Sequence, residues 1–254
     1  MFVSCKKDNT NKVPPVKTDT TAVTPVYALV WSDEFDGTNV DATKWTFETG
    51  NLDVNSEEEY YQPQNAAVSN GNLVITAKKE LVGDQPYTSA RMNTLGKFSQ
   101  TYGRIEARIK LPMGQGMWPA FWMLGTNITT VSWPQCGELD IMEHINDTGS
   151  IYGTMHWNVN GHVSYGHTTT TTPADYHIYA IEWDANEIRW YVDSTLYQTG
   201  NIKDNVNTTG AFHLPFFILL NLAVGGSFPG QTVDESLLPE SMYVDYVRVY
   251  KQTN

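Results

Sequence analysis

The chain has 254 residues, of which 41% are hydrophobic and 17% are charged, and its formal net charge is −12. This acidic balance argues against nucleic acid or an anionic polymer as a partner. The high aromatic content, with 8 Trp and 14 Tyr, excludes a coiled coil, a collagen or a fully disordered chain. Since no apolar run approaches ~18 residues, no transmembrane helix is expected.

Residues 1–26 are rich in Thr, Pro, Lys, Asp and Asn, and the stretch 6–26 has no aromatic residue. Such a segment buries too little apolar area to offset its ordering entropy, so we expect a flexible linker before a single domain at 27–254. The opening letters MFVSCKK resemble the end of a bacterial lipoprotein signal. The resemblance implies an extracellular or cell-surface-anchored protein with a membrane tether through a lipid on Cys5. The alternative is a cytosolic tail with an ordinary cysteine.

From residue 27 onward, apolar residues follow the period of β-strands. In the stretch 103–111, Ile105, Ala107 and Ile109 alternate with charged residues, which is typical of a strand with one buried face. Similar runs, separated by turns such as Asn70-Gly71, lie at 66–77, 176–183, 187–193, 214–224 and 242–250. The threonines at 168–172 predict a loop or hairpin tip. With no helical period and no repeat, the pattern predicts one all-β sandwich or barrel.

The motif at 137–144 places three carboxylates, Glu138, Asp140 and Glu143, within six residues, with strongly apolar residues between them. In a regular strand Glu138 and Asp140 share a face and Glu143 points the other way. One inserted residue, a β-bulge, would return Glu143 to the face of the other two. The spacing therefore predicts a bulged strand that presents three acids on one side.

Three acids on one face can carry out glycoside hydrolysis with retention, which needs two carboxyl groups about 5–5.5 Å apart. One must be ionised to attack the anomeric carbon, and the other must be protonated to donate to the leaving oxygen. Asp140 can hydrogen-bond Glu138 and share a proton with it. The alternatives are a solvated face on an edge strand or a calcium site, and a calcium site leaves the apolar residues between the acids unexplained.

Residues 138–143, ELDIME, resemble the E-x-D-x-x-E signature of glycoside hydrolase family 16, and in particular its bacterial laminarinases. The flanking stretches agree with the family in chain order, at 31–37, 116–124, 154–157 and 243–250. The resemblance implies a concanavalin-like β-jelly roll of two antiparallel sheets with a concave substrate cleft. It also implies an endo-β-1,3-glucanase.

Carried over by resemblance, Glu138 is the nucleophile and Glu143 the acid/base, while Asp140 orients and tunes Glu138. His156 is expected near the Glu143 end as a hydrogen-bonding partner; its other interpretation is a satisfied core histidine.

The resemblance also implies substrate-binding residues. Trp118 and Trp122 are expected to stack on glucose rings, unless they fill the core as most tryptophans do. Arg91 resembles a position that binds sugar hydroxyls, and a surface salt bridge is its alternative. Asn55 and Glu57 resemble a segment near the cleft. Just before them, 52–54 reads Leu-Asp-Val where the family has Gly-Trp-Gly, so the donor-side subsites are expected to differ.

A structural Ca²⁺ is the second feature that the resemblance implies, held by Glu34, the carbonyl of Gly71 and the carboxylate of Asp245. The period of the last strand puts Asp245 on the same face as the apolar Val247 and Val249, an odd place for a free carboxylate. The alternative is a buried Asp paired with an arginine or with backbone. No zinc motif is visible.

The sequence thus predicts a retaining endo-β-1,3-glucanase, monomeric and without a catalytic cofactor, acting on laminarin-like glucan, with mixed-linkage β-1,3-1,4-glucan as an additional candidate substrate. The extra residue in the motif argues against the lichenase and xyloglucan branches of the family. Agarases and carrageenases share it and are the nearest alternative, although sulfated galactans should favour a basic cleft. The alternative from another class is a non-catalytic β-glucan-binding module.

Overall fold

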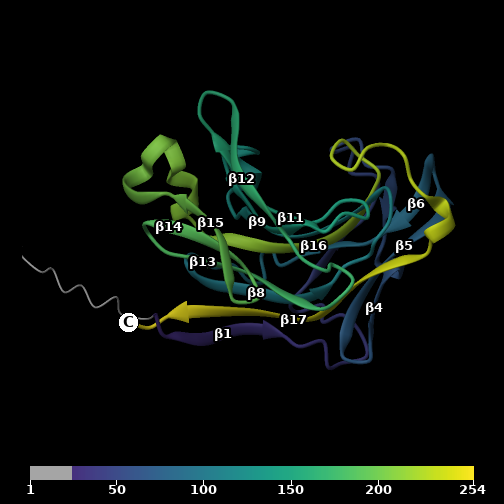
Figure 1. The fold of residues 1–254 in the computed structure, drawn as a ribbon, viewed down its shortest axis with the longest axis horizontal. Coiled ribbons are helices and arrows are strands. Elements are labelled where there is room, and N and C mark those ends of the chain that lie inside the picture. The colour runs from purple at the N-terminus through teal and green to yellow at the C-terminus, as the bar shows by residue number, and fades with distance from the viewer. Residues whose placement is uncertain (1–24) are drawn as a thin grey trace, which may run out of the picture.

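Two largely antiparallel sheets, stacked face to face, make up most of residues 25–254, the part of the chain that the computed structural model describes (Figure 1). In Figure 1, β1, β17 and β8 lie in the lower layer, and β16, β11 and β12 lie above them. The expected all-β sandwich is confirmed. The tail assigned to 1–26, with Cys5, lies outside the described residues except for its last two positions.

The larger sheet has ten strands. Its order is β15 (Thr195–Asn201), β14 (Glu187–Val192), β13 (His177–Trp183), β8 (Gly103–Lys110), β17 (Glu240–Gln252), β5 (Asn72–Val82), β6 (Gln85–Ser89) and β3 (Glu59–Tyr61). In addition, β1 (Tyr27–Asp33) pairs with β17 and β4 (Ala66–Ser69) pairs with β5. The β4–β5 hairpin turns at Asn70-Gly71, as its turn residues predict.

The smaller sheet has seven strands, and it carries the predicted site. Its order is β12 (His162–Thr170), β11 (Ser150–Asn158), β10 (Glu138–Glu143), β9 (Met117–Gly125), β16 (Phe216–Val224), β7 (Arg91–Asn93) and β2 (Thr46–Glu48). Helical turns are short: η1 (Pro63–Asn65), α1 (Ile128–Val131), η2 (Lys203–His213) and η3 (Glu235–Leu237). None of the helices in 25–254 is long and apolar enough to span a bilayer.

The hydrophobic core lies between the two sheets. Ile105, Ala107 and Ile109 of β8 are fully buried, so the alternating pattern read from the sequence is confirmed. All nine residues of β16 are buried, which explains why its sequence reads as a continuous apolar run.

The expectation for the threonine run is wrong in part. Thr168, Thr169 and Thr170 continue β12 and pair with β11 as far as Ser150, and the chain leaves the sheet only after them. Threonine has a high strand propensity because it is β-branched, and the hairpin partner was not visible in the sequence.

Candidate active site

The central strand of the site, β10, contains the predicted bulge. Against β9, Asp140 pairs with Trp122, and the next pair joins Met142 to Phe121, so the strand has one residue more than its partner. The register shifts at the same place against β11. Because of this extra residue, Glu143 returns to the face that carries Glu138 and Asp140.

Residues of the hydrophobic core contact the bulge on the face that points toward the other sheet. Leu139, Ile141 and Met142 are buried in the core between the sheets. Trp190, from the opposite sheet, donates an Nε1–H bond of 2.8 Å to the backbone carbonyl of Asp140. A bulge leaves backbone groups without ladder partners, and this buried bond satisfies one of them.

The three acids line an open cavity of about 310 Å³ on the outer face of the smaller sheet. Its lining includes all of the predicted catalytic and substrate-binding residues except His156: Asn55, Glu57, Arg91, Trp118, Trp122, Glu138, Asp140 and Glu143. Both tryptophans line this cavity and neither belongs to the core between the sheets, while their stacking on glucose rings stays a prediction.

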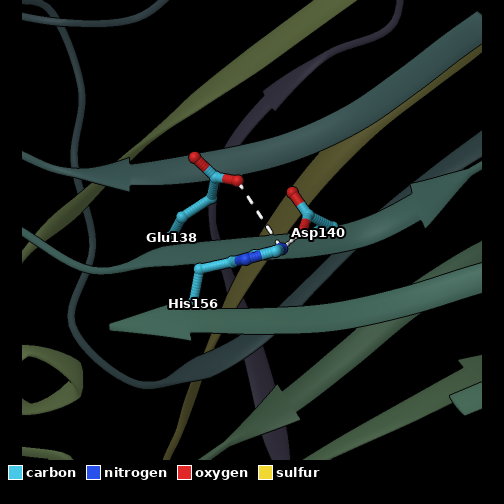
Figure 2. A group of neighbouring side chains, drawn as sticks. All are labelled: Glu138, Asp140 and His156. Atoms are coloured by element: carbon cyan, nitrogen blue, oxygen red, sulfur yellow. Dashed lines mark ion pairs between the residues drawn. The ribbon is translucent and has the colours of Figure 1, made fainter. Parts of the chain in front are cut away.

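His156 lies between two of the acids (Figure 2). Its Nε2 is 3.0 Å from Oδ2 of Asp140 and 3.8 Å from Oε1 of Glu138. The expected position near Glu143 is wrong: in the antiparallel pair, His156 is opposite Glu138, whereas Tyr152 is opposite Glu143. The sequence predicts a direct hydrogen bond between the carboxyl groups of Asp140 and Glu138. In the structure, the imidazole of His156 lies close to both of them instead.

Burial raises the pKa of all three carboxyl groups. For Glu138 the charge of Asp140 adds to the effect of burial, and for Asp140 burial is the cause. Burial, followed by the charge of Asp140, raises the pKa of Glu143 to about 8. Trp118 donates an Nε1–H bond of 2.9 Å to Oε1 of Glu143, which counteracts part of that rise.

Trp122 is fixed on the other side of the acids by its polar neighbours. Its Nε1–H donates to Oδ1 of Asn221 at 2.8 Å, and the Arg91 guanidinium lies 4.8 Å from its ring centroid. Arg91 also pairs with Glu48 at 2.8 Å. The salt-bridge interpretation of Arg91 is therefore confirmed. The same side chain lines the cavity, and its binding of sugar hydroxyls stays a prediction.

Asn55 and Glu57 belong to the same polar network. Asn55 donates to Oε1 of Glu57 at 3.1 Å, and the Tyr61 hydroxyl donates to Oε2 at 3.0 Å. Asn221 in turn donates to the Tyr61 hydroxyl at 3.2 Å. The chain of bonds from Trp122 to Asn55 holds this end of the cavity in one arrangement.

Sequence reasoning missed Trp133 and Asn221, which also line the cavity. Trp133 hydrogen-bonds the carboxylate of Glu138 and thereby lowers its pKa. Asn221 had a visible signal, since it is the one polar residue in the apolar run 216–224. A polar side chain in a wholly buried strand usually has a specific partner.

The positions predicted for calcium meet at one junction of the larger sheet. Strand β17 pairs with β5 up to Val244 and with β1 from Val247, so Asp245 lies between the segments that lead to the Gly71 turn and to Glu34, which follows the end of β1. The expectation that its carboxylate lies on the apolar face is wrong. A register shift at this position leaves the side chain 37% exposed, and it pairs with Arg108 at 2.7 Å. Glu34 likewise pairs with Arg248.

Among the described residues, one cluster of His, Asp and Glu atoms has the spacing of a metal site: Glu138, Asp140 and His156, within 4.8 Å of one another. A metal there would occupy the carboxylates that face the cavity. We therefore interpret the cluster as a proton-exchanging group and not as a metal site.

Comparison with known proteins identifies the class. The model of glycosyl hydrolases family 16 matches residues 53–248, and the chain therefore belongs to this family. The laminarinase catalytic domain of Thermotoga petrophila has 44% identity and a TM-score of 0.84, with 91% of this chain and all of that domain aligned. The jelly-roll expectation is thereby confirmed.

This chain covers very different shares of two curated relatives. The Beta-glucanase of Rhodothermus marinus is 41% identical over 246 residues, which is 89% of this chain and 86% of that protein. The alpha subunit of Clotting factor G from Tachypleus tridentatus is 42% identical, but this chain spans only 35% of it.

Proposed function

We propose that the protein is a retaining endo-β-1,3-glucanase that cleaves laminarin-like glucans, with mixed-linkage β-1,3-1,4-glucan as an additional substrate. The observation that carries this proposal is the bulge in β10, which puts Glu138, Asp140 and Glu143 in one open cavity. Relatives named laminarinase and Beta-glucanase support the choice of substrate.

In the first step, Glu143 acts as the general acid and Glu138 as the nucleophile. Glu143 is suited to this role because burial raises its pKa to about 8, so it holds a proton at neutral pH. It gives that proton to the glycosidic oxygen while the Glu138 carboxylate attacks the anomeric carbon. The bond to the leaving sugar breaks, and a covalent glycosyl–enzyme forms.

In the second step, Glu143 acts as the general base. Now ionised, it takes a proton from a water molecule, whose oxygen attacks the anomeric carbon and releases Glu138 as a carboxylate. Two inversions at one carbon give net retention of the β configuration.

Asp140 and His156 keep Glu138 ready to attack. Two buried carboxyl groups this close are not both ionised easily, so a proton resides on the more deeply buried Asp140, whose side chain is 5% exposed against 17% for Glu138. The Nε2–H of His156 and the bond from Trp133 then stabilise the charge on Glu138.

The test is hydrolysis of laminarin, followed by the release of reducing ends. Glu138→Gln should lower turnover by about three orders of magnitude while glucan binding is preserved, because one member of a cooperating catalytic set is lost. Glu187→Gln is the matched control, since Glu187 pairs with Arg189 on the other sheet. Equal turnover in wild type and Glu138→Gln would remove the nucleophile assignment.

The same assay separates the alternatives. A non-catalytic binding module would retain laminarin on a column and release no reducing ends. An agarase or carrageenase would cleave agarose or carrageenan in parallel reactions and leave laminarin intact. Either result would overturn the glucanase proposal.

We further propose that Ca²⁺ binds at the junction of Glu34, Gly71 and Asp245. The support is that the strand pairings bring two carboxylates and a turn carbonyl, ligands that calcium prefers, to one junction of the larger sheet. Both carboxylates pair with arginines in this structure, so binding requires them to exchange Arg248 and Arg108 for the ion. The catalytic steps above do not involve this site.

We also propose that the protein acts as a monomer outside the cytoplasm and is anchored through a lipid on Cys5. The support for the anchor and for this location is the sequence of the first seven residues. Mass spectrometry of the N-terminal peptide from cell membranes should find a lipid mass on Cys5. An unmodified cysteine in a peptide that retains Met1 would contradict the anchor.

A further inference from the structure

A second histidine stands behind His156, and the mechanism above does not use it. His162 is the first residue of β12, and its Nε2 lies 2.8 Å from Nδ1 of His156. The two rings are close to parallel, with 16° between their planes and 5.1 Å between their centroids.

The register of the β11–β12 hairpin brings the two rings together. Asn158 pairs with His162 and His156 pairs with Ser164, so the histidines are diagonal neighbours on one face of the sheet. The turn between the strands is closed by Asn158, whose Oδ1 accepts from the backbone N–H of Gly161 at 3.0 Å. The position of His162 therefore follows from the hairpin itself.

The bonding partners determine which nitrogen of each ring carries a proton. Glu138 is ionised and offers only acceptors, and with the proton of Asp140 on Oδ1 its Oδ2 is an acceptor as well. Nε2 of His156 faces these two groups at 3.8 and 3.0 Å, so this nitrogen carries a proton. In the neutral ring its Nδ1 is then a lone pair, and a lone pair needs a donor. His162 must supply that donor as an Nε2–H.

We propose that His162 is a positioning residue for the glucanase reaction, because its Nε2–H holds His156 in the tautomer that turns an N–H toward Asp140 and Glu138. This inference rests on the proposed function for its kinetic effect, but the tautomer is a property of the resting protein. In the other tautomer, the lone pair of His156 Nε2 would face Oδ2 of Asp140 and the ionised Glu138 and would be repelled by them.

Trp133 completes the arrangement. Its ring centroid lies 4.7 Å from that of His162 and 6.4 Å from that of His156. The ionisable groups that face His156 are Glu138 and Asp140 on β10 and His162 on β12, with Glu143 acting across the cavity. Trp133 adds no charge, so it packs against His162 without competing for the proton.

Two substitutions separate the hydrogen bond from the packing. His162→Phe keeps a ring against Trp133 and removes the N–H donor, whereas His162→Gln removes the ring and keeps an N–H donor. For His162→Phe we expect kcat on laminarin to fall about tenfold, which corresponds to about 1.4 kcal/mol, with KM little changed. The acidic limb of the pH profile should also move to higher pH, because the carboxylate pair loses stabilisation of its charge.

His162→Gln should retain most of the wild-type rate and the wild-type pH profile. His167→Phe is the matched control, since His167 is on the same strand and contacts Tyr165, away from the acids. Thermal melting of each variant establishes that it is folded. The proposal would be overturned if His162→Phe matched wild type, or if His162→Gln were as impaired as His162→Phe.

A second readout needs no turnover. In ¹⁵N NMR spectra of the wild-type protein, His156 should be the Nε2–H tautomer, and His162→Phe should give a mixture of both. A wild-type His156 protonated on Nδ1 alone would overturn the proposal. This measurement needs no substrate, so it remains valid even if the protein does not cleave laminarin. Failure of the His162 proposal can therefore be distinguished from failure of the glucanase proposal.

Discussion

The three acids of the cavity differ in their immediate contacts, and these differences decide their roles. Glu143 accepts a hydrogen bond from Trp118, whereas Asp140 and Glu138 share the imidazole of His156. The sequence pattern predicts the trio and its common face, because one inserted residue is enough to return Glu143 to the side of Glu138 and Asp140. It could not predict the neighbours, because these come from other strands.

The first prediction concerns the alkaline limit of activity. The general acid must be protonated, so kcat/KM should fall as pH rises through about 8, the pKa of Glu143. Trp118→Phe removes the N–H that stabilises the Glu143 carboxylate, so the pKa should rise and the alkaline limb should move to higher pH. An alkaline limb unmoved in Trp118→Phe would contradict the assignment of Glu143.

Glu59 is a buried acid outside the catalytic trio. It is 1% exposed, its Oε2 accepts from the backbone N–H of Val224 at 2.6 Å, and its Oε1 has no hydrogen-bond partner in 25–254. Burial, with a contribution from Glu57, raises its pKa well above the ordinary 4.5. A protonated Glu59 can donate from the oxygen that otherwise lacks a partner.

The second prediction follows from this raised pKa. Because the folded protein keeps the proton that the unfolded chain loses, stability is at its full value below pH 4.5 and is lost as pH rises toward the folded pKa. Glu59→Gln removes this loss, so its melting temperature should exceed that of wild type at pH 8 by about 2–4 °C for each kcal/mol recovered. At pH 4 the two should melt together. An equal difference at both pH values would contradict a proton on Glu59.

At the scale of elements, a loop after β16 supports the cavity wall. Gly226 has a φ of 119°, and a Cβ there would lie 3.2 Å from the Asn55 carbonyl and 3.2 Å from the Trp118 ring. Gly230, in the same loop, has a φ of 90° and open space around it. Both glycines have a positive φ, which favours glycine. Only Gly226 has neighbours that an added Cβ would contact.

The third prediction compares these glycines. Gly226→Ala should raise KM for laminarin about three- to tenfold, because the methyl group pushes Asn55 and Trp118 away from their positions at the cavity, a displacement worth about 1 kcal/mol. Gly230→Ala carries similar backbone strain and should leave KM unchanged. Equal KM values for both variants, measured on folded protein, would show that this wall does not contact the glucan.

The strands were largely predictable, because period-two alternation follows directly from a sheet with one buried face. Strand pairing was not, since His156 was placed beside Glu143 when the antiparallel register puts it beside Glu138. Register depends on turn geometry and on contacts with partner strands, neither of which a single sequence displays.

At the scale of the molecule, the site is assembled from distant parts of the chain. Trp122 and Asn221, joined by a hydrogen bond, are 99 positions apart, and Arg91 comes from a third strand. The family resemblance supplied several of these residues, but the bonds that connect them required the structure. The junction of β1, β5 and β17, where Asp245 lies, is another such long-range meeting point.

The fourth prediction tests calcium at that junction. If Ca²⁺ binds at Glu34, Gly71 and Asp245, EDTA should lower the melting temperature, and added Ca²⁺ should restore it, because a ligand of the folded state alone stabilises that state. Asp245→Asn should abolish the response. An unchanged melting curve, with no metal found by elemental analysis, would leave the arginine pairs as the only role of these carboxylates.

The central claim is that the bulge in β10 turns Glu143 toward the sugar that Glu138 attacks. The most direct measurement is ¹H NMR of the reducing ends during the first minutes of laminarin hydrolysis. A retaining mechanism gives the β-anomer first, and the α-anomer follows only by mutarotation. If the α-anomer appeared first, water and not Glu138 would be the attacking group, and the roles given to Glu138 and Glu143 would be wrong.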